Sequence, residues 1–303
     1  MIHAAFEGRY EQTALLGRGA YGVVVKTRCG RAIKWVRAGA STEDVYHDRE
    51  LEALDYCRHP NVVSLIESTK YNGDLYLVLE CWSTSLAFQL RRPAFTLDQG
   101  NWILMNVLRG LAHIHECGYI HRDLKPANIL LNTDSVCIAD FGHAVTYPPR
   151  SEVVTIQTDP EQSDKVFTRW YRPPEVTMVM PYDESADVFS VGCVYVEIVR
   201  KALGQIPYAL FHESGASFPL SGTVSEERQH IENMFRVLGT PTKEELAKMS
   251  RSALYEFVDS LPDYERVELG FPAMQTAWVY AMLAYDPSVR ISAAKMLEWV
   301  EDA

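Results

Sequence analysis

The chain has 303 residues, of which 47% are hydrophobic and 23% charged, and its formal net charge is −11. This composition is typical of a globular protein and excludes disordered and collagen-like chains. The acidic balance disfavours nucleic acid and anionic membranes as partners. No apolar run reaches the roughly 20 residues of a membrane-spanning helix, and the first ten residues lack the apolar stretch of a secretory signal.

Six cysteines are spread along the sequence without a C-x-x-C pair. This spacing argues against a disulfide framework or a structural zinc site. It favours core thiols in a reducing compartment, so we expect an intracellular protein of the cytoplasm, the nucleus or both. His113 and His115 stand two residues apart in a helical pattern and therefore point to different faces, which disfavours a metal site there.

The first part of the chain is expected to consist of strands and one helix. Apolar and β-branched residues on both sides of a glycine cluster predict strands over 10–36. Ser41 to Asp44 resembles a capping box, which predicts a helix from there to about Cys57. Two more strands are expected at 62–67 and 74–80, joined by a turn at Asn72-Gly73.

Beyond Cys81 the apolar residues recur with the period of a helix. Long helices are predicted over 97–116 and 186–201, and the second is apolar almost all round, which indicates burial. Shorter helices and two loops complete the prediction, the helices at 226–238, 243–249, 272–285 and 291–301 and the loops at 143–168 and 204–225. We expect an α+β, bilobal fold with a β-rich lobe over residues 1–82 and a larger helical lobe over 83–303.

Residues 16–24, LGRGAYGVV, contain the pattern G-x-G-x-x-G. In dinucleotide-binding folds such glycines lead from a strand into a helix, whereas here the next segment is a second strand. A glycine hairpin lets backbone N–H groups approach the phosphates of a nucleotide; an ordinary glycine-rich hairpin is the alternative. Lys34 on the next strand can neutralise phosphate charge, with Glu50 of the following helix as its partner.

Two later strings are more specific: HRDLKPAN at 121–128 and DFG at 140–142. Together they contain a base, a lysine, an amide and a metal-binding carboxylate. With these motifs the chain resembles the eukaryotic protein kinases over roughly residues 10–300, and Lys125 is similar to that of Ser/Thr kinases. The resemblance implies the bilobal kinase fold, ATP and Mg²⁺ as cofactors, and phosphate transfer to Ser/Thr hydroxyls of protein substrates.

The resemblance also implies roles for single residues. Asp123 would accept the proton of the substrate hydroxyl, Lys125 would neutralise the transferred phosphoryl group, and Lys34 would contact the α- and β-phosphates while paired with Glu50. Asn128 and Asp140 would hold two Mg²⁺. The other residues implied at the ATP site form the glycine loop, the adenine pocket and the hinge: Leu16, Gly17, Gly19, Gly22, Val24, Ala32, Glu80, Trp82 and Leu130. Core packing explains the apolar members equally well.

Residues 168–175, TRWYRPPE, resemble the CMGC group, which contains the cyclin-dependent and mitogen-activated kinases. Within the group, Arg169 to Glu175 with Pro173 is most similar to cyclin-dependent kinases. No Thr-x-Tyr pair precedes Thr168, which disfavours a mitogen-activated kinase. By this resemblance Arg172 helps to shape a site that accepts proline after the phosphoacceptor. Glu175 is expected to form an ion pair with Arg290 that anchors the activation segment.

The sequence leaves the regulation open. Ser163 corresponds to an activating phosphosite with Arg122 and Arg49 as its phosphate ligands, but Val145 stands where a third arginine is usual. Tyr21 resembles an inhibitory phosphosite, with an exposed aromatic as the alternative. Protein substrates are the expected partners, whereas a cyclin or another regulatory subunit stays open because Asp48 suits an apolar cyclin groove poorly. The alternatives are a monomeric kinase that activates cyclin-dependent kinases, a mitogen-activated kinase and, least favoured, a pseudokinase scaffold.

Overall fold

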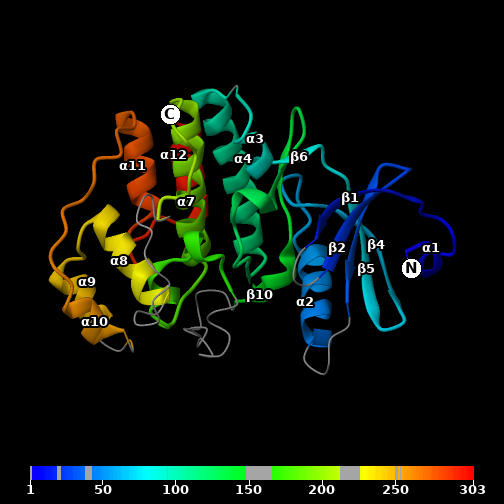
Figure 1. Ribbon diagram of the computed structural model, residues 1–303, viewed down its shortest axis with the longest axis horizontal. Coiled ribbons are helices and arrows are strands. Elements are labelled where there is room, and N and C mark those ends of the chain that lie inside the picture. The colour runs from blue at the N-terminus through cyan, green and yellow to red at the C-terminus, as the bar shows by residue number, and fades with distance from the viewer. Residues whose placement is uncertain are drawn as a thin grey trace.

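The computed structural model of the chain describes residues 2–18, 22–37, 43–93, 95–147, 166–211, 226–249, 252 and 254–303. Figure 1 shows a sheet at the amino-terminal end of the molecule, with α2 beside it, and a larger group of helices at the other end. The predicted α+β, bilobal fold is confirmed.

The amino-terminal sheet is antiparallel, with the order β1-β2-β3-β5-β4. Its strands and flanking helices are β1 (Gln12–Arg18), β2 (Gly22–Thr27), β3 (Arg31–Val36), β4 (Leu65–Tyr71), β5 (Asp74–Glu80), α1 (Ile2–Ala5) and α2 (Glu43–Tyr56). One face packs against the amino-terminal segment, where Phe6 contacts a cluster that includes Ile33 and Tyr76. Because successive side chains of a strand alternate between faces, Lys34 points to the opposite face, toward α2.

The turn at Asn72-Gly73 forms as predicted, with both residues at positive φ (53° and 86°). However, β4 begins at Leu65 and not at residue 62. Val62 forms a bridge with Ile138 instead, because the segment before β4 is fastened to the helical lobe. The side chain of Asn61 donates to Asn106 Oδ1 and to the carbonyl oxygen of Val136, at 3.0 and 2.8 Å.

The helical lobe is built around α4 and α7. Its longer helices are α4 (Leu97–Glu116), α7 (Ser185–Ala202), α8 (Glu226–Leu238), α11 (Ala273–Met282) and α12 (Ala293–Glu301). Its short elements are α3 (Leu86–Gln89), α6 (Pro174–Thr177), α9 (Lys243–Lys248), α10 (Tyr255–Asp259), β6 (Thr84–Ser85), β7 (Tyr119–Ile120), β8 (Ile129–Leu131), β9 (Val136–Ile138) and β10 (Val145–Thr146). Helix α12 packs against α4, while α7 packs against both α4 and α11, which helps to explain why α7 is buried on nearly all sides, as predicted.

The ends of the helices follow their capping residues. The bounds predicted for α4 are confirmed, because Thr96 and Gln99 form a capping box at its start. The last two helices begin slightly later than predicted, since Pro272 and Ser292 stand at their N-caps, and α11 ends at Met282 and not at residue 285. The short helices α1, α3, α6 and α10 were not predicted, because four or five residues are too few to show a helical period. Most of the two predicted loops lies outside the described residues, as do Ser41 and Thr42.

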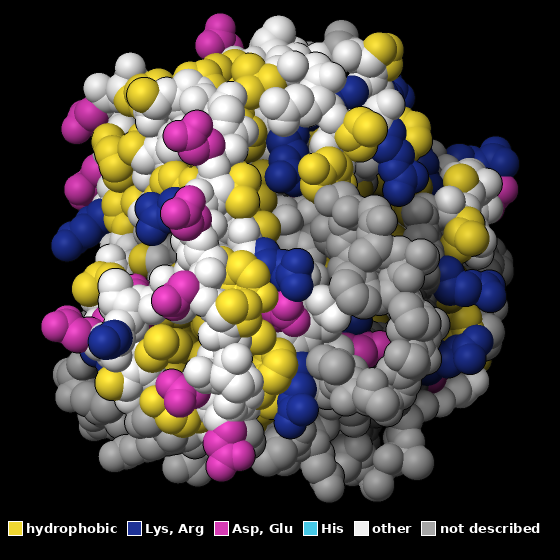
Figure 2. Space-filling model, turned by 60° about the vertical axis from the view of Figure 1, so that its left-hand side comes forward, with side chains coloured by type: hydrophobic (Ala, Val, Ile, Leu, Met, Phe, Trp, Pro, Cys, Tyr) yellow, Lys and Arg dark blue, Asp and Glu magenta, His cyan; other side chains and the backbone are white. Residues whose placement is uncertain are grey.

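The surface is mixed in character. Figure 2 shows acidic side chains standing singly among hydrophobic and uncharged ones over the left-hand part of the view. Among the described residues, no helix has both the length and the apolar character that crossing a membrane requires.

Candidate active site

The loop from His121 to Asn128 is held in place by Asp187 of α7. The carboxylate of Asp187 accepts the backbone N–H groups of His121 and Arg122 at 2.7 and 2.8 Å. This support matters because Arg122 has a φ of 64°, which is unfavourable for a residue other than glycine. Burial acts to raise the pKa of Asp187, but the hydrogen bond with His115 and the contact with His121 hold the pKa below its ordinary value. A charged Asp187 therefore stabilises the loop.

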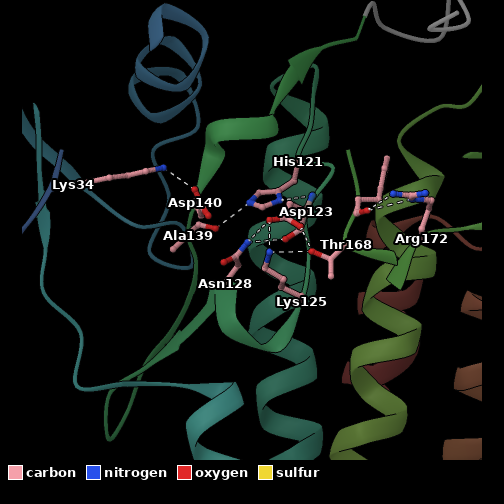
Figure 3. Close-up of polar contacts among 10 residues, drawn as sticks. Lys34, His121, Asp123, Lys125, Asn128, Ala139, Asp140, Thr168 and Arg172 are labelled. Atoms are coloured by element: carbon pink, nitrogen blue, oxygen red, sulfur yellow. Dashed lines mark hydrogen bonds and ion pairs between the residues drawn. The ribbon is translucent and has the colours of Figure 1, made fainter. Parts of the chain in front are cut away.

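The carboxylate of Asp123 accepts hydrogen bonds from three side chains (Figure 3). Its Oδ2 accepts from Lys125 Nζ at 2.7 Å and from Asn128 Nδ2 at 3.0 Å, and its Oδ1 accepts from the hydroxyl of Thr168 at 2.7 Å. Lys125 also donates to the Thr168 hydroxyl, at 3.0 Å. A carboxylate oxygen has about two acceptor positions. Oδ1 therefore keeps one acceptor position with which Asp123 can receive a proton from another hydroxyl.

His121 orients this carboxylate through the backbone. Its Nδ1 accepts the backbone N–H of Asp123 at 3.2 Å, and its Nε2 faces the carbonyl oxygen of Ala139 at 3.1 Å. The ring of Phe141 packs edge-on against the imidazole, with the centroids 5.0 Å apart. Because His121 and Phe141 are both fully buried, the loop and the segment that carries Asp140 form one packed unit.

Lys34 joins the sheet, α2 and the loop after β9. Its Nζ donates to Glu50 Oε1 and to Asp140 Oδ1, both at 2.6 Å. Burial acts to lower the pKa of Lys34, but the charges of Glu50 and Asp140 outweigh it and raise the pKa above its ordinary value. Conversely, the charge of Lys34 holds the pKa of Asp140 well below its usual range. The lysine is therefore a cation and Asp140 an anion at neutral pH.

The site contains oxygen donors suited to a hard cation. The Asp140 side chain is 43% exposed. Asn128 commits its amide nitrogen to the carbonyl and carboxylate oxygens of Asp123, so its amide oxygen is the acceptor that remains. Carboxylate and amide oxygens are the ligands that Mg²⁺ uses in proteins. The described residues contain no group of three or more His, Cys, Asp or Glu that could hold a metal, so a metal at this site would need ligands from a substrate or water.

The residues expected around a nucleotide lie on β1 to β3, at the end of β5 and on β8. Val24 pairs with Lys34 across β2 and β3, and Leu16 on β1 is 48% exposed. Gly22 cannot carry a side chain, because an added Cβ would lie 2.1 Å from the carbonyl oxygen of Trp35. The remaining expected residues occupy the strands just named or the segment after β5: Gly17, Ala32, Glu80, Trp82 and Leu130. Gly19, also expected at the nucleotide, and the possible phosphosite Tyr21 lie outside the described residues.

A cavity of about 370 Å³ opens beside Asp123, between Lys125 and the segment from Phe167 to Arg172. Phe167 has a φ of 57°, in the left-handed region. Its carbonyl oxygen accepts from Nε and Nη2 of Arg172, at 3.3 and 3.2 Å (Figure 3). The wall of the cavity thus contains a backbone carbonyl that is already bound by an arginine.

The same segment is anchored to the rest of the lobe by the expected ion pair. Arg290 donates to both carboxylate oxygens of Glu175, at 2.7 and 3.0 Å, and the two side chains are 0% and 2% exposed. Arg290 also donates to the carbonyl oxygens of Ser185 and Ala284. Such a two-pronged pair fixes orientation as well as position.

The residues expected to receive a phosphate are only partly described. Arg122 Nε donates to the carbonyl oxygen of His143 at 2.6 Å, and its Nη1 donates to the hydroxyl of Tyr182 at 3.1 Å. Arg49 lies exposed on α2, whereas Ser163 falls outside the described residues. Arg122 therefore has partners within the protein itself.

Three further residues support the site, although the sequence analysis assigned them no role. Thr168 was noticed only as part of a family motif, His115 only as a disfavoured metal ligand, and Tyr182 not at all. Each acts through a contact between distant segments, Thr168 with Asp123, His115 with Asp187 and Tyr182 with Arg122. No local pattern marks such contacts, although the position of Thr168 as the first residue of the TRWYRPPE string was one available signal.

Residues 10–300 match the family model described as the protein kinase domain, so the chain belongs to the protein kinase family. It is 34% identical to cell division control protein 2 homolog 3 of Trypanosoma brucei brucei, over 97% of this chain and 93% of the relative. It is 31% identical to mitogen-activated protein kinase 14 of Xenopus laevis, over 95% of this chain and 78% of the relative. It is 32% identical to mitogen-activated protein kinase 2 of Arabidopsis thaliana, over 96% of this chain and 76% of the relative.

These relatives are all Ser/Thr kinases of the CMGC group, and the chain is a Ser/Thr protein kinase of that group. Membership of this family implies ATP as the phosphate donor, Mg²⁺ as its usual companion and proteins as substrates.

Proposed function

We propose that Asp123 accepts the proton of a Ser/Thr hydroxyl while the γ-phosphate of ATP is transferred to it. The observation that carries this proposal is the set of bonds around Asp123. Lys125 and Asn128 hold one carboxylate oxygen, and Thr168 holds the other without filling it. Phosphoryl transfer needs mainly positioning and charge neutralisation, and Lys125 places a cation at the carboxylate itself.

The donor atoms near Asp123 fit Mg²⁺. Asp140 and the amide oxygen of Asn128 would hold the ion, which neutralises phosphate charge when it is bound. The charge of Lys34 favours the ionised form of Asp140, the form that binds a cation. Lys34 itself is kept charged and in place by Glu50, so it would neutralise phosphate charge when a nucleotide is bound.

The test compares wild type with Asp123→Asn and Asp140→Ala in transfer of radiolabelled phosphate from ATP to a protein substrate. We expect both variants to lose orders of magnitude in kcat while keeping the circular dichroism spectrum and the thermal midpoint of wild type within a few degrees. Arg236→Gln, on the exposed side of α8, is the matched control and should keep full activity. Substantial turnover by purified Asp140→Ala would contradict the mechanism.

We also propose that the enzyme prefers proline directly after the phosphoacceptor. Support comes from the wall of the cavity beside Asp123, where Arg172 occupies the carbonyl oxygen of Phe167. An ordinary residue would bring a backbone N–H to this wall without an acceptor, and a buried unpaired donor costs about 1–3 kcal/mol. Proline has no N–H and avoids that cost. The expected preference in kcat/KM is roughly 5- to 150-fold.

The test uses two peptides that differ only in Ser-Pro or Ser-Ala. Wild type should favour the Ser-Pro peptide by the factor above. Arg172→Gln should reduce the ratio, mainly by improving the Ser-Ala peptide, because the Phe167 carbonyl becomes available to a substrate N–H. Equal use of both peptides by wild type would refute the preference, while transfer to Ser would still stand.

Within the CMGC group we propose a cyclin-dependent-kinase-like enzyme that is active without a cyclin. The similarity to cell division control protein 2 homolog 3 over 93% of that relative supports the first part. The position of α2 supports the second, since Glu50 already contacts Lys34 and α2 packs against the 3-10 turn Phe141–His143 in a single chain. Activity of a monomer, measured across a size-exclusion peak, tests this. If activity appears only after a cyclin is added, the second part is wrong.

A further inference from the structure

Two cysteines that lie far apart in the sequence meet where α2 rests on the helical lobe. Cys57 directly follows α2, and Cys117 is the C-cap residue of α4. The sulfur of Cys117 lies 3.7 Å from the carbonyl oxygen of Tyr56, so the Cys117 side chain lies against the peptide group that joins Tyr56 to Cys57. All six cysteines are free thiols in the structure.

The segment that carries Cys57 is already fixed on the helical lobe. Asn61 bonds to Asn106, and the backbone of Asn61 and Val63 bonds to Ile138. Gly110 of α4 permits this close approach, because a Cβ there would lie 2.5 Å from the carbonyl oxygen of Asn61. The fold therefore holds the segment that carries Cys57 against the end of α4 that carries Cys117.

The two thiols differ in access and surroundings. Cys117 is partly exposed, and its sulfur lies 3.5 Å from Nε2 of His113. Cys57 is fully buried, and burial together with the neighbouring Cys117 raises the pKa of its thiol to about 12. Because the thiolate is the reactive form and needs access to an oxidant, Cys117 reacts first and Cys57 second.

A metal site is the competing use of this cluster, since His113 stacks on His59, with the ring centroids 4.9 Å apart. Two cysteines and two histidines form a common zinc ligand set. However, no group of three or more such side chains in the described part of the chain has the arrangement to hold a metal. The geometry favours thiol chemistry over metal binding.

We propose that Cys57 and Cys117 form a redox-sensitive dithiol that hydrogen peroxide converts to a disulfide, tying α2 to α4. First, the Cys117 thiolate attacks one oxygen of the peroxide and gives a sulfenic acid, while the other oxygen leaves as water after taking up a proton. Then the Cys57 sulfur displaces the sulfenic hydroxyl, which leaves as a second water. Overall the two thiols lose two electrons and two protons, and one peroxide becomes two waters.

The bond acts on the element that carries Glu50. Cys57 lies seven residues beyond Glu50, or about 10 Å along a helix. Since the thiols meet while Glu50 contacts Lys34, the disulfide restrains α2 in this position. Oxidation therefore preserves activity and stabilises the protein. The effect on activity rests on the proposed function, whereas formation of the disulfide does not.

The test treats the fully reduced chain with a small excess of hydrogen peroxide, blocks the remaining thiols and maps the peptides. We expect a linked peptide pair that contains Cys57 and Cys117, and its loss on adding dithiothreitol. Cys117→Ser, at a partly exposed position, should prevent the link without affecting folding. Cys29→Ser removes an exposed thiol that is not part of the pair and is the matched control, which should keep the link. Cys57→Ser and Cys57→Ala test the buried partner.

Two further readouts address α2. The oxidised wild type should melt higher than the reduced form by on the order of 5 °C, and hydrogen exchange over residues 49–57 should slow, with neither change in Cys117→Ser. Absence of the linked pair, or Cys117 recovered as sulfinic acid beside reduced Cys57, would overturn the dithiol. A linked protein with an unchanged melting temperature and unchanged exchange would overturn the restraint on α2. If the reduced wild type and all of its variants fail alike to transfer phosphate, that result would count against the proposed function alone.

Discussion

Replacing Thr168 by valine removes one hydroxyl and keeps nearly the same shape. In the structure this hydroxyl donates to Oδ1 of Asp123 at 2.7 Å and accepts from Lys125 at 3.0 Å. Thr168 therefore positions the base and the lysine at once. A hydrogen bond to a charged group contributes about 1.5–3 kcal/mol, and each 1.36 kcal/mol corresponds to a factor of ten in rate. We expect Thr168→Val to lower kcat roughly 10- to 150-fold.

The assay is steady-state phosphate transfer to a Ser peptide with saturating ATP, so that kcat and KM are separated. The loss should lie mainly in kcat, because Thr168 acts on Asp123 and on Lys125. Thr168→Ser keeps the hydroxyl and should recover activity to within about threefold of wild type. A valine variant as active as wild type would refute the positioning role, and so would a serine variant as inactive as the valine one.

Two further predictions concern stability. Glu175→Gln leaves the charge of Arg290 buried without its partner, and it should lower the free energy of unfolding, measured by urea denaturation, by about 3–5 kcal/mol. Arg236→Gln removes an exposed ion pair and should lower it by under about 1 kcal/mol; equal losses in the two variants would contradict this. Burial raises the pKa of Glu197 to about 7 although the Tyr171 hydroxyl opposes it, so the folded state keeps a proton that the unfolded chain releases above about pH 4.5. Wild-type stability should therefore fall between about pH 4.5 and 7, and Glu197→Gln should gain up to about 3 kcal/mol relative to wild type over this window; a constant difference from pH 5 to pH 8 would exclude the effect.

Local patterns predicted the elements that depend on local physics. The helix over 97–116 and the turn at Asn72-Gly73 are encoded within a few residues, and both occur where the sequence predicts them. Motif spacing also identified Lys34 and Glu50, which the structure brings together at 2.6 Å.

Long-range contacts could not be predicted from local patterns. The start of β4 was predicted three residues too early. Asn61 is hydrogen-bonded to Asn106 of the helical lobe, and a local pattern cannot show this contact because Asn106 is 45 residues away. The bond from Thr168 to Asp123 spans a similar distance in sequence. The proximity of Cys117 to the segment that carries Cys57 was also missed, since the spacing of the two cysteines matches no cysteine motif. In each case it is the tertiary packing that brings the two residues together.

The most direct test of the central claim is the single-turnover rate of γ-phosphate transfer to a Ser peptide by Asp123→Asn, compared with wild type at saturating Mg²⁺ and ATP. This substitution keeps the size of the side chain and an acceptor oxygen but removes the carboxylate that takes up the proton. If Asp123 is the base, the rate should fall by about 10²–10⁴-fold with ATP affinity unchanged. A rate within a few-fold of wild type would show that another group accepts the proton.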